Sequence, residues 1–282
     1  MKAKILLVFI LFNLVLCAQP YNGERTINVN LDNRAASCSP PSGSSFLELN
    51  NVKALIHTGG NLWQITGQNF CHYEIPKGSG TMALFTSALW LGGVDVNGQL
   101  KLAALRYREG QDYWTGPLTT AGDATIPTEV CSEYDKHFRI TKDEVKLFNV
   151  WYTSGLEDQA NGTNTQGENF SNYQIPQSIL NWPAHGDVSL GQDYFLAPFY
   201  DRDQDGFYDP LNDGDYPWYD LNKEIDCKTS RTVTLFGDET LWWVMNDKGN
   251  IHTETGGEPI GMEIRAQAFA FATNNEINNS TF

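Results

Sequence analysis

An aspartate-rich segment interrupted by prolines most constrains the possible folds of this chain. Residues 201–209 read Asp-Arg-Asp-Gln-Asp-Gly-Phe-Tyr-Asp, which places carboxylates at positions one, three, five and nine of a loop and glycine at position six. EF-hand calcium loops have this order, because alternate side chains converge on a hard cation and glycine permits a sharp turn. Pro198, Pro210 and Pro217 exclude the paired helices of an EF-hand. The segment therefore predicts a calcium loop without helices.

The expected calcium ligands continue past position nine. Position twelve is Asn212, where an EF-hand has a bidentate glutamate, so Asp213 or Asp215 is expected to complete the shell. Phe207, at position seven, would contribute its backbone carbonyl. The predicted ligands are those of Asp201, Asp203, Asp205, Phe207, Asp209, Asp213 and Asp215.

The charge of this segment favours a bound cation. Residues 201–220 contain seven Asp and one Arg, a local charge of −6. Two like charges 4 Å apart repel by about 1 kcal/mol in bulk water and about 4 kcal/mol at an effective dielectric of 20. A divalent cation reverses this repulsion, so folding of the loop and calcium binding should be linked. A solvated acidic turn is the alternative, and magnesium is less expected because it retains waters and needs few carboxylates.

The N-terminus has the features of a signal peptide. Lys2 and Lys4 precede an apolar run at 5–16, and Ala18 is the small residue expected before a cleavage site, so residues 1–18 are predicted to be removed. Lipid anchoring at Cys17 is the alternative, but the bulky Leu16 does not fit a lipobox. No later apolar run is long enough for a transmembrane helix. We expect a secreted protein, extracellular or on the outer cell surface.

The remaining cysteines are even in number. Cys38, Cys71, Cys131 and Cys227 pass through an oxidising compartment if the signal is used, so two disulfides are expected. Three pairings are possible, and the sequence does not choose among them. A zinc site is disfavoured because no C-x-x-C spacing or nearby histidine pair is present.

The net charge excludes one class of partner. The 282 residues include 34 Asp and Glu against 19 Lys and Arg, a formal net charge of −15. Removal of Lys2 and Lys4 with the signal changes this to −17. No cluster of basic residues could follow a phosphate backbone, so nucleic acid is not expected as a partner.

The patterns predict a mainly β protein with a few short helices and antiparallel sheets, sandwich-like or irregular. Asn97-Gly98 between apolar segments indicates a hairpin with a type I′ turn. Thr141 and Glu144 fit a capping box for a helix over 142–153, and a shorter turn is expected at Pro176. Strands are expected at 231–236, 240–246 and 261–273. In the last of these the phenylalanines join the charged face, which indicates a bulge or burial on both sides.

The expected organisation has three parts. A signal peptide at 1–18 is followed by a polar lead at 19–48 and a β-rich extracellular region at 49–282. The last part could divide into subdomains at 49–135 and 136–282, and we expect the natural polypeptide to continue beyond it.

Several short motifs resemble one family of exported proteins, the large multidomain surface proteins of the Bacteroidetes that often carry a type IX secretion sorting domain. The resemblance spans about 50–282 and rests on Pro76-Lys77-Gly78-Ser79-Gly80, Ala88-Leu89-Trp90-Leu91-Gly92-Gly93, Asp112-Tyr113-Trp114-Thr115-Gly116-Pro117, Trp182-Pro183-Ala184-His185-Gly186-Asp187, Ala197-Pro198-Phe199-Tyr200, Gly214-Asp215-Tyr216-Pro217, Gly237-Asp238 and Met262-Glu263-Ile264-Arg265-Ala266-Gln267-Ala268-Phe269. It implies secretion across both membranes and a binding, adhesive or structural role at the surface, without an activity to transfer. No segment resembles the sorting domain itself.

Two further features bear on function. Trp242 and Trp243 are adjacent on a predicted strand, so in a sheet with one solvent face only one can be core, and the other is a candidate ligand contact. His185 lies sixteen residues before the aspartate loop, and a turn role is favoured over a place in the site.

We therefore favour a non-enzymatic, calcium-stabilised surface module that contacts protein or glycan. The alternatives are a polysaccharide hydrolase, which needs two carboxylates about 5 to 9.5 Å apart, and a carbohydrate-binding domain.

Overall fold

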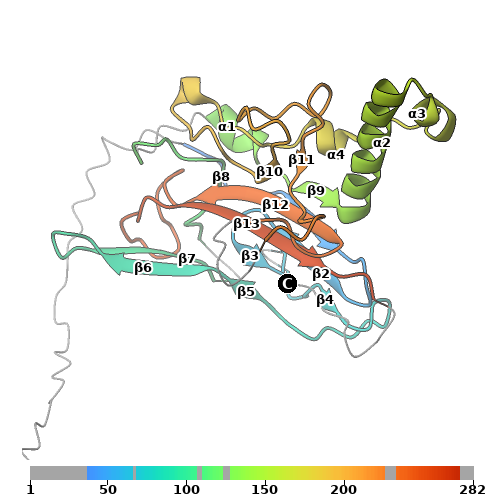
Figure 1. Ribbon diagram of the computed structural model, residues 1–282. Helices are drawn as coiled ribbons and strands as arrows, with labels where there is room; N and C mark the ends of the chain where they lie inside the picture. Colours follow the sequence, from blue (N-terminus) through green and yellow to red (C-terminus); the bar gives the residue numbers. More distant parts are fainter. Residues whose placement is uncertain (1–36, 66–67, 107–109, 123–127, 226–232, 274–282) are drawn as a thin grey trace, which may run out of the picture. The chain divides into compact units, whose positions relative to one another are not determined.

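The strand β12 (Glu239–Asn246) forms the centre of the fold and is buried along its whole length (Figure 1). It pairs antiparallel with β13 (Glu263–Ala270) in an unbroken register of eight residue pairs. Its other edge pairs with β9 (Phe138–Thr141) at one end and with β8 (Trp114–Thr115) at the other. This computed structural model describes residues 37–65, 68–106, 110–122, 128–225 and 233–273. The predicted signal peptide and Cys227 lie outside them.

The two adjacent tryptophans of β12 face opposite sides of the sheet, and both are core residues. Trp242 is 3% exposed and packs beside Trp182, whereas Trp243 is 5% exposed and packs with Leu47 of a second sheet. The prediction that only one of them can be a core residue is wrong. The reason is that the β12–β13 sheet is covered on both faces, so alternation places each indole in a different core.

The second sheet packs against one face of β12 and β13. Its strands are β1 (Ser44–Leu47), β2 (Lys53–His57), β3 (Asn61–Leu62), β4 (Tyr73–Glu74) and β5 (Ser87–Ala88). They run in the order β1-β2-β3-β5, with β4 also paired to β2. Apolar side chains from both sheets form one buried cluster. The expected mainly β fold with antiparallel sheets is confirmed.

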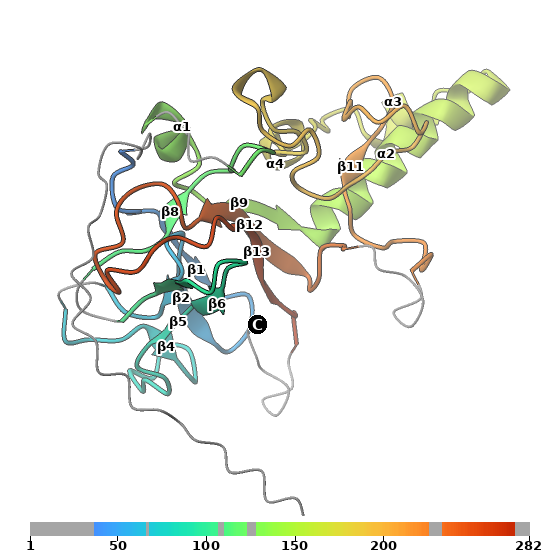
Figure 2. The same cartoon turned by 90° about the vertical axis from the view of Figure 1, so that its left-hand side faces the viewer.

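Helices and loops cover the opposite face of β12. The longest helix is α2 (Lys142–Asn161), and the shorter ones are α1 (Thr128–Glu133), α3 (Thr165–Asn169), α4 (Gln177–Leu180) and the 3-10 helix η2 (Val188–Leu190). Val145 and Phe148 of α2 are fully buried in the same cluster as Trp242. Figure 2 shows α2 projecting along one side of this layer.

The capping box of α2 is present as predicted. Thr141 Oγ1 accepts a hydrogen bond from the Glu144 backbone N–H, and the Glu144 side chain accepts one from the Thr141 N–H. The helix continues eight residues past the predicted end at 153. It stops where Gly162 adopts a left-handed conformation with φ of 67°, a common helix terminator. The shorter turn expected at Pro176 is the four-residue helix α4, for which Pro176 is the N-cap.

The predicted hairpin is formed by β6 (Trp90–Val94) and β7 (Leu100–Ala104). Its turn differs from the expected type I′. A type I′ turn needs a positive φ at both central residues, and Asn97 does not have one. Gly98 has φ of 77°, and its N–H donates to the Asp95 carbonyl. This arrangement is a type I turn followed by a left-handed glycine. Asp95 favours it by accepting the N–H groups of Asn97 and Gln99.

In the C-terminal third, one expected strand is absent from the described residues, and one of the two alternatives for 261–273, the bulge, is excluded. In 233–236, where a strand was expected, only Leu235 pairs, through an isolated bridge to Tyr219. The unbroken β12–β13 register excludes a bulge in β13. Phe269 instead forms an aromatic group with Phe236 and Phe271 at the edge of the sheet.

The described part of the predicted polar lead belongs to the folded unit. Cys38 is fully buried and forms a disulfide with Cys131 of α1. β1 also falls within this lead, and β8 pairs with β12 across the subdomain boundary expected at 135. Cys71 is a free thiol, so the second expected disulfide is not seen, while Cys227 lies outside the described residues. No helix in the described ranges is both long and apolar enough to cross a bilayer.

Three histidines near the second sheet have Nε2 atoms that are buried without a hydrogen-bond partner: His57, His72 and His137. The His137 ring meets the Trp243 indole edge-on at 5.0 Å, and its Nδ1 lies 3.0 Å from Ser45 Oγ. Burial, with a smaller contribution from the nearby His57, lowers the pKa of His137 to about 4. Burial also lowers the pKa of His57. Protonation of His57 and of His137 is therefore unfavourable in the folded state.

We expect His57 and His137 to make the protein less stable in acid. Between pH 6.5 and about 4 the unfolded chain binds protons at His137 that the folded chain does not, so the free energy of unfolding falls as the pH falls. The shift corresponds to at most about 3 kcal/mol. Urea unfolding of the native protein and of His137→Gln, both in chelator at pH 7.5, 6 and 5, measures this. The native protein should lose more stability, and equal losses in the two proteins would contradict the assignment.

Candidate functional site

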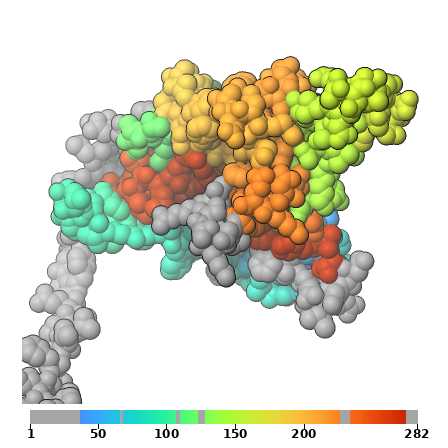
Figure 3. Space-filling model, viewed as in Figure 1, coloured from blue at the N-terminus to red at the C-terminus, as the bar shows by residue number. Residues whose placement is uncertain are grey.

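The aspartate loop connects two short paired strands. β10 (Phe199–Tyr200) and β11 (Tyr216–Pro217) are antiparallel, so residues 201–215 form the loop of a hairpin whose base is fixed by backbone pairing. Tyr200 and Tyr216 stack at this base with ring centroids 4.9 Å apart. In the space-filling view the orange atoms of this region lie at the surface beside the green helix α2 (Figure 3). The predicted loop without flanking helices is thus what the chain forms.

Helix α2 holds the loop from one side. The Arg202 guanidinium donates to Asn149 Oδ1 at 2.6 Å and lies over the Tyr152 ring, 5.0 Å from its centroid. The Tyr152 hydroxyl donates to the Asn212 carbonyl at 2.6 Å. Gly214, with φ of 76°, lies against the Tyr152 ring, and a Cβ there would overlap it. The position of the loop therefore depends on residues of α2, and the spacing of the aspartates in the sequence did not predict these contacts.

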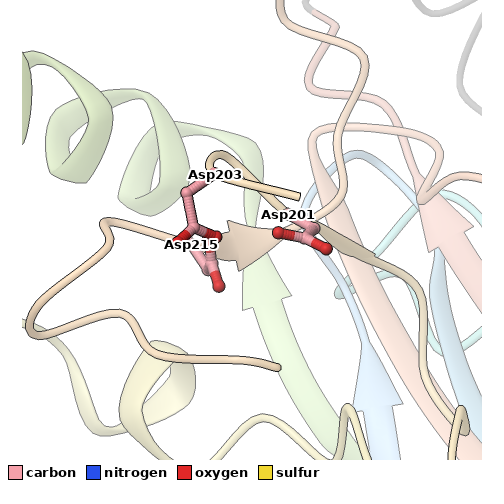
Figure 4. A group of neighbouring side chains, drawn as sticks. All are labelled: Asp201, Asp203 and Asp215. Carbon is pink, nitrogen blue, oxygen red and sulfur yellow. The ribbon is translucent and has the colours of Figure 1, made fainter. Parts of the chain in front are cut away.

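The loop gathers five carboxylates into two groups that share one residue. Oxygens of Asp201, Asp203 and Asp215 all lie within 4.8 Å of one another, and so do those of Asp203, Asp205 and Asp213. Figure 4 shows Asp203 and Asp215 side by side, with Asp201 across from them. Five of the six aspartates predicted as ligands are thus brought together, with Asp203 in the middle.

Local hydrogen bonds aim these side chains inward. Asp201 accepts the backbone N–H groups of Gln204 at 2.7 Å and Gly206 at 2.8 Å. Asp203 and Asp205 each accept the N–H two residues further on, at 3.3 and 2.7 Å. Gly206 has φ of 82°, which a side chain would disfavour. These turns bend the backbone around the carboxylates, as the glycine at position six predicted.

Asp215 closes the loop from its far end. This fully buried residue accepts the N–H of Arg202 at 2.9 Å and of Asp209 at 3.1 Å. Burial raises the pKa of its carboxyl, and the Arg202 and Asp209 N–H groups partly oppose this while Asp201 and Asp203 add to it. Desolvation likewise raises the pKa of Asp213, with repulsion from Asp203 next in size. A cation placed among these oxygens would reverse both shifts.

Asp209 lies outside both carboxylate groups, although it was predicted as the ligand at position nine. Its Oδ1 accepts the N–H groups of Leu211 and Asn212, and its Oδ2 accepts the Asn212 side-chain amide. These hydrogen bonds, led by the Asn212 side chain, lower the pKa of Asp209. The carboxylate therefore stabilises a local turn. The Asp209 carbonyl meanwhile accepts the N–H groups of Asp213 and Gly214.

His185 has a structural part in the loop. Its Nε2 accepts the Tyr208 N–H at 2.9 Å, and its Nδ1 lies 3.1 Å from the Tyr194 carbonyl. A carbonyl only accepts, so Nδ1 is the donor in this contact. The half-exposed Phe207 ring stacks on His185 with centroids 5.6 Å apart. His185 thus links the loop to the preceding turn, in agreement with the favoured turn role.

The donor set fits a hard cation. The gathered atoms are carboxylate oxygens, and no histidine nitrogen or cysteine sulfur belongs to either group among the described residues. Oxygen donors in a flexible arrangement of six to eight ligands suit calcium, whereas zinc prefers nitrogen and sulfur in a tetrahedron. The Phe207 carbonyl is in the chain position to add a neutral ligand.

Comparison with known proteins adds no assignment: no protein family, curated protein or solved structure matches this chain.

Proposed function

We propose that this protein is a calcium-binding structural or adhesive module that acts outside the cell, secreted or on the outer cell surface, without enzymatic activity. The observation that carries the proposal is the convergence of five aspartates within a hairpin loop, in two groups that share Asp203. Their order in the chain follows the calcium loop of EF-hands, and the structure supplies the inward turns that such a loop needs. Calcium would hold the carboxylates together and so order the surface around the loop.

Two observations support export. The Cys38–Cys131 disulfide is typical of proteins that fold in an oxidising compartment. The apolar N-terminal run preceded by lysines is typical of a signal peptide. Together with the motifs shared with exported Bacteroidetes surface proteins, these features favour a type IX secretion substrate whose partner is a protein or glycan at the cell surface.

The hydrolase alternative finds less support. The aromatic cavity described below has Asp201 as its sole carboxylate among the described residues that line it. A glycoside hydrolase needs two carboxyl groups on opposite sides of the bond to be cleaved.

Calcium should raise the melting temperature of the oxidised protein. At a hundredfold excess over the dissociation constant, binding to the folded state adds about 2.7 kcal/mol, which corresponds to about 5 to 10 °C for a chain of this size. Scanning calorimetry with calcium, with magnesium and with chelator measures the shift. The rise should be largest with calcium.

A matched pair of variants locates the effect. Asp203→Asn removes a charge shared by both carboxylate groups while keeping its shape. Asp143→Asn removes the same charge from an exposed site on α2, where the side chain is 92% exposed. Calcium should stabilise Asp143→Asn as it does the native protein and should stabilise Asp203→Asn much less. Equal shifts in the two variants would contradict the proposal.

A further inference from the structure

A cavity of about 410 Å³ lies directly beside the aspartate loop. Four aromatic side chains line it, those of Phe195, Phe199, Trp218 and Trp242. Phe195 is 52% exposed, whereas Trp242 at the sheet is buried, so the aromatic lining extends from the surface inward. The volume is within the range of small-molecule sites, about 300 to 1,000 Å³.

Gln267, one of the residues that line the cavity, carries an unpaired acceptor. Gln267 Oε1 is buried without a hydrogen-bond partner, while the Nε2 of the same side chain donates to the Thr234 carbonyl at 3.0 Å. That bond fixes which end of the amide is the acceptor. A buried acceptor without a donor is unfavourable, because it has lost its hydrogen bonds to water. An occupant with a hydroxyl or N–H group would satisfy it, and a purely apolar occupant would not.

The two charged side chains that line the cavity, Arg265 and Asp201, already have partners within the protein. Arg265 is paired with Glu263 at 2.7 Å and with Asp193 at 2.8 Å. The Asp201 carboxylate accepts two backbone N–H groups and belongs to the candidate calcium site. Neither an anion nor an organic cation therefore finds a free countercharge here, and the site favours an uncharged ligand.

We propose that this cavity binds one neutral sugar ring of a glycan. A pyranose has an apolar C–H face that can stack on the rings of Phe195 and Trp218, and hydroxyl groups that can donate to Gln267 Oε1. The proposal rests on the binding role proposed above and names the ligand class of that role. Asp201 lines the cavity and also joins the carboxylate group, so loop and cavity share a wall.

Ligand-observed NMR of the disulfide-bonded protein tests this with glucose, galactose, mannose, fucose, xylose and N-acetylglucosamine, each in calcium and in chelator. We expect saturation transfer to at least one of these sugars. Absence of binding by all six in both conditions would overturn the inference. Calcium binding is measured separately on the same sample, so the loss of this inference leaves the calcium proposal standing, and the reverse also holds.

Variants locate the sugar in the cavity. Phe195→Ala should weaken binding about three- to tenfold, because one stacking surface is lost. Gln267→Leu keeps the size of the side chain but removes the acceptor, and should weaken binding about fivefold. Phe271→Ala is the control, because this ring is 46% exposed and is not among the residues that line the cavity. Melting curves confirm that each variant folds. Unchanged affinity in both cavity variants would place the sugar elsewhere and overturn the inference.

Discussion

Removal of the Cys38–Cys131 disulfide is expected to lower the free energy of unfolding by about 2 to 5 kcal/mol. The bond joins residues 93 positions apart, so it restricts a long loop of the unfolded chain. It also ties the segment before β1 to α1, where both sulfurs are buried beside Trp114. The double variant Cys38→Ser/Cys131→Ser removes the bond without leaving a reactive thiol.

Chemical denaturation of this double variant, in calcium, measures the change. The control is Cys71→Ser, which alters the half-buried free thiol and should change stability by less than about 1 kcal/mol. A double variant as stable as the native protein would show that the disulfide contributes little to the fold.

The second large effect is expected at the centre of the fold. Trp242→Ala should lower the free energy of unfolding by about 3 to 5 kcal/mol, because it leaves a cavity between the sheet and the helical layer. The Trp242 indole lies 6.1 Å from the Trp182 ring and 6.0 Å from the Phe138 ring, so both would lose a neighbour. Denaturant unfolding gives the difference directly.

An exposed tryptophan provides the matched control for that substitution. Trp90 on β6 is 68% exposed and makes a hydrogen bond from its Nε1 to the Leu105 carbonyl. Trp90→Ala should therefore cost about 1 kcal/mol. Similar losses for the two variants would contradict the two-sided burial of β12.

The proximity of the aspartates could be predicted from the sequence where the contacts are local. Asp201, Asp203 and Asp205 alternate along an extended turn, and each carboxylate accepts a nearby backbone N–H, so their spacing is enough to place them together. Asp213 and Asp215 were expected to complete the shell and do lie within the two groups. Asp209 lies outside both groups because its carboxylate accepts the Asn212 side-chain amide, a contact that ligand spacing does not reveal.

Features that depend on residues far apart in the chain could not be predicted from local sequence spacing. Arg202, within the loop, is anchored by Asn149, 53 residues earlier, and no pattern near residue 149 signals that contact. The burial of both Trp242 and Trp243 was missed for the same reason. Alternation along a strand predicts that the two side chains face opposite sides of the sheet, but it does not predict that both sides are covered. The capping box and the hairpin were found because their signals lie within a few residues of one another. The turn type was missed because Asn97-Gly98 is compatible with more than one turn.

Calorimetric titration of the oxidised protein with calcium at neutral pH decides whether the aspartate loop is a cation site. We expect saturable binding, with a much weaker response to magnesium and to calcium in Asp203→Asn. Asp143→Asn should bind calcium as the native protein does. Heat no larger than that of dilution, or the same isotherm for both variants, would mean that the five converging carboxylates form a solvated acidic turn.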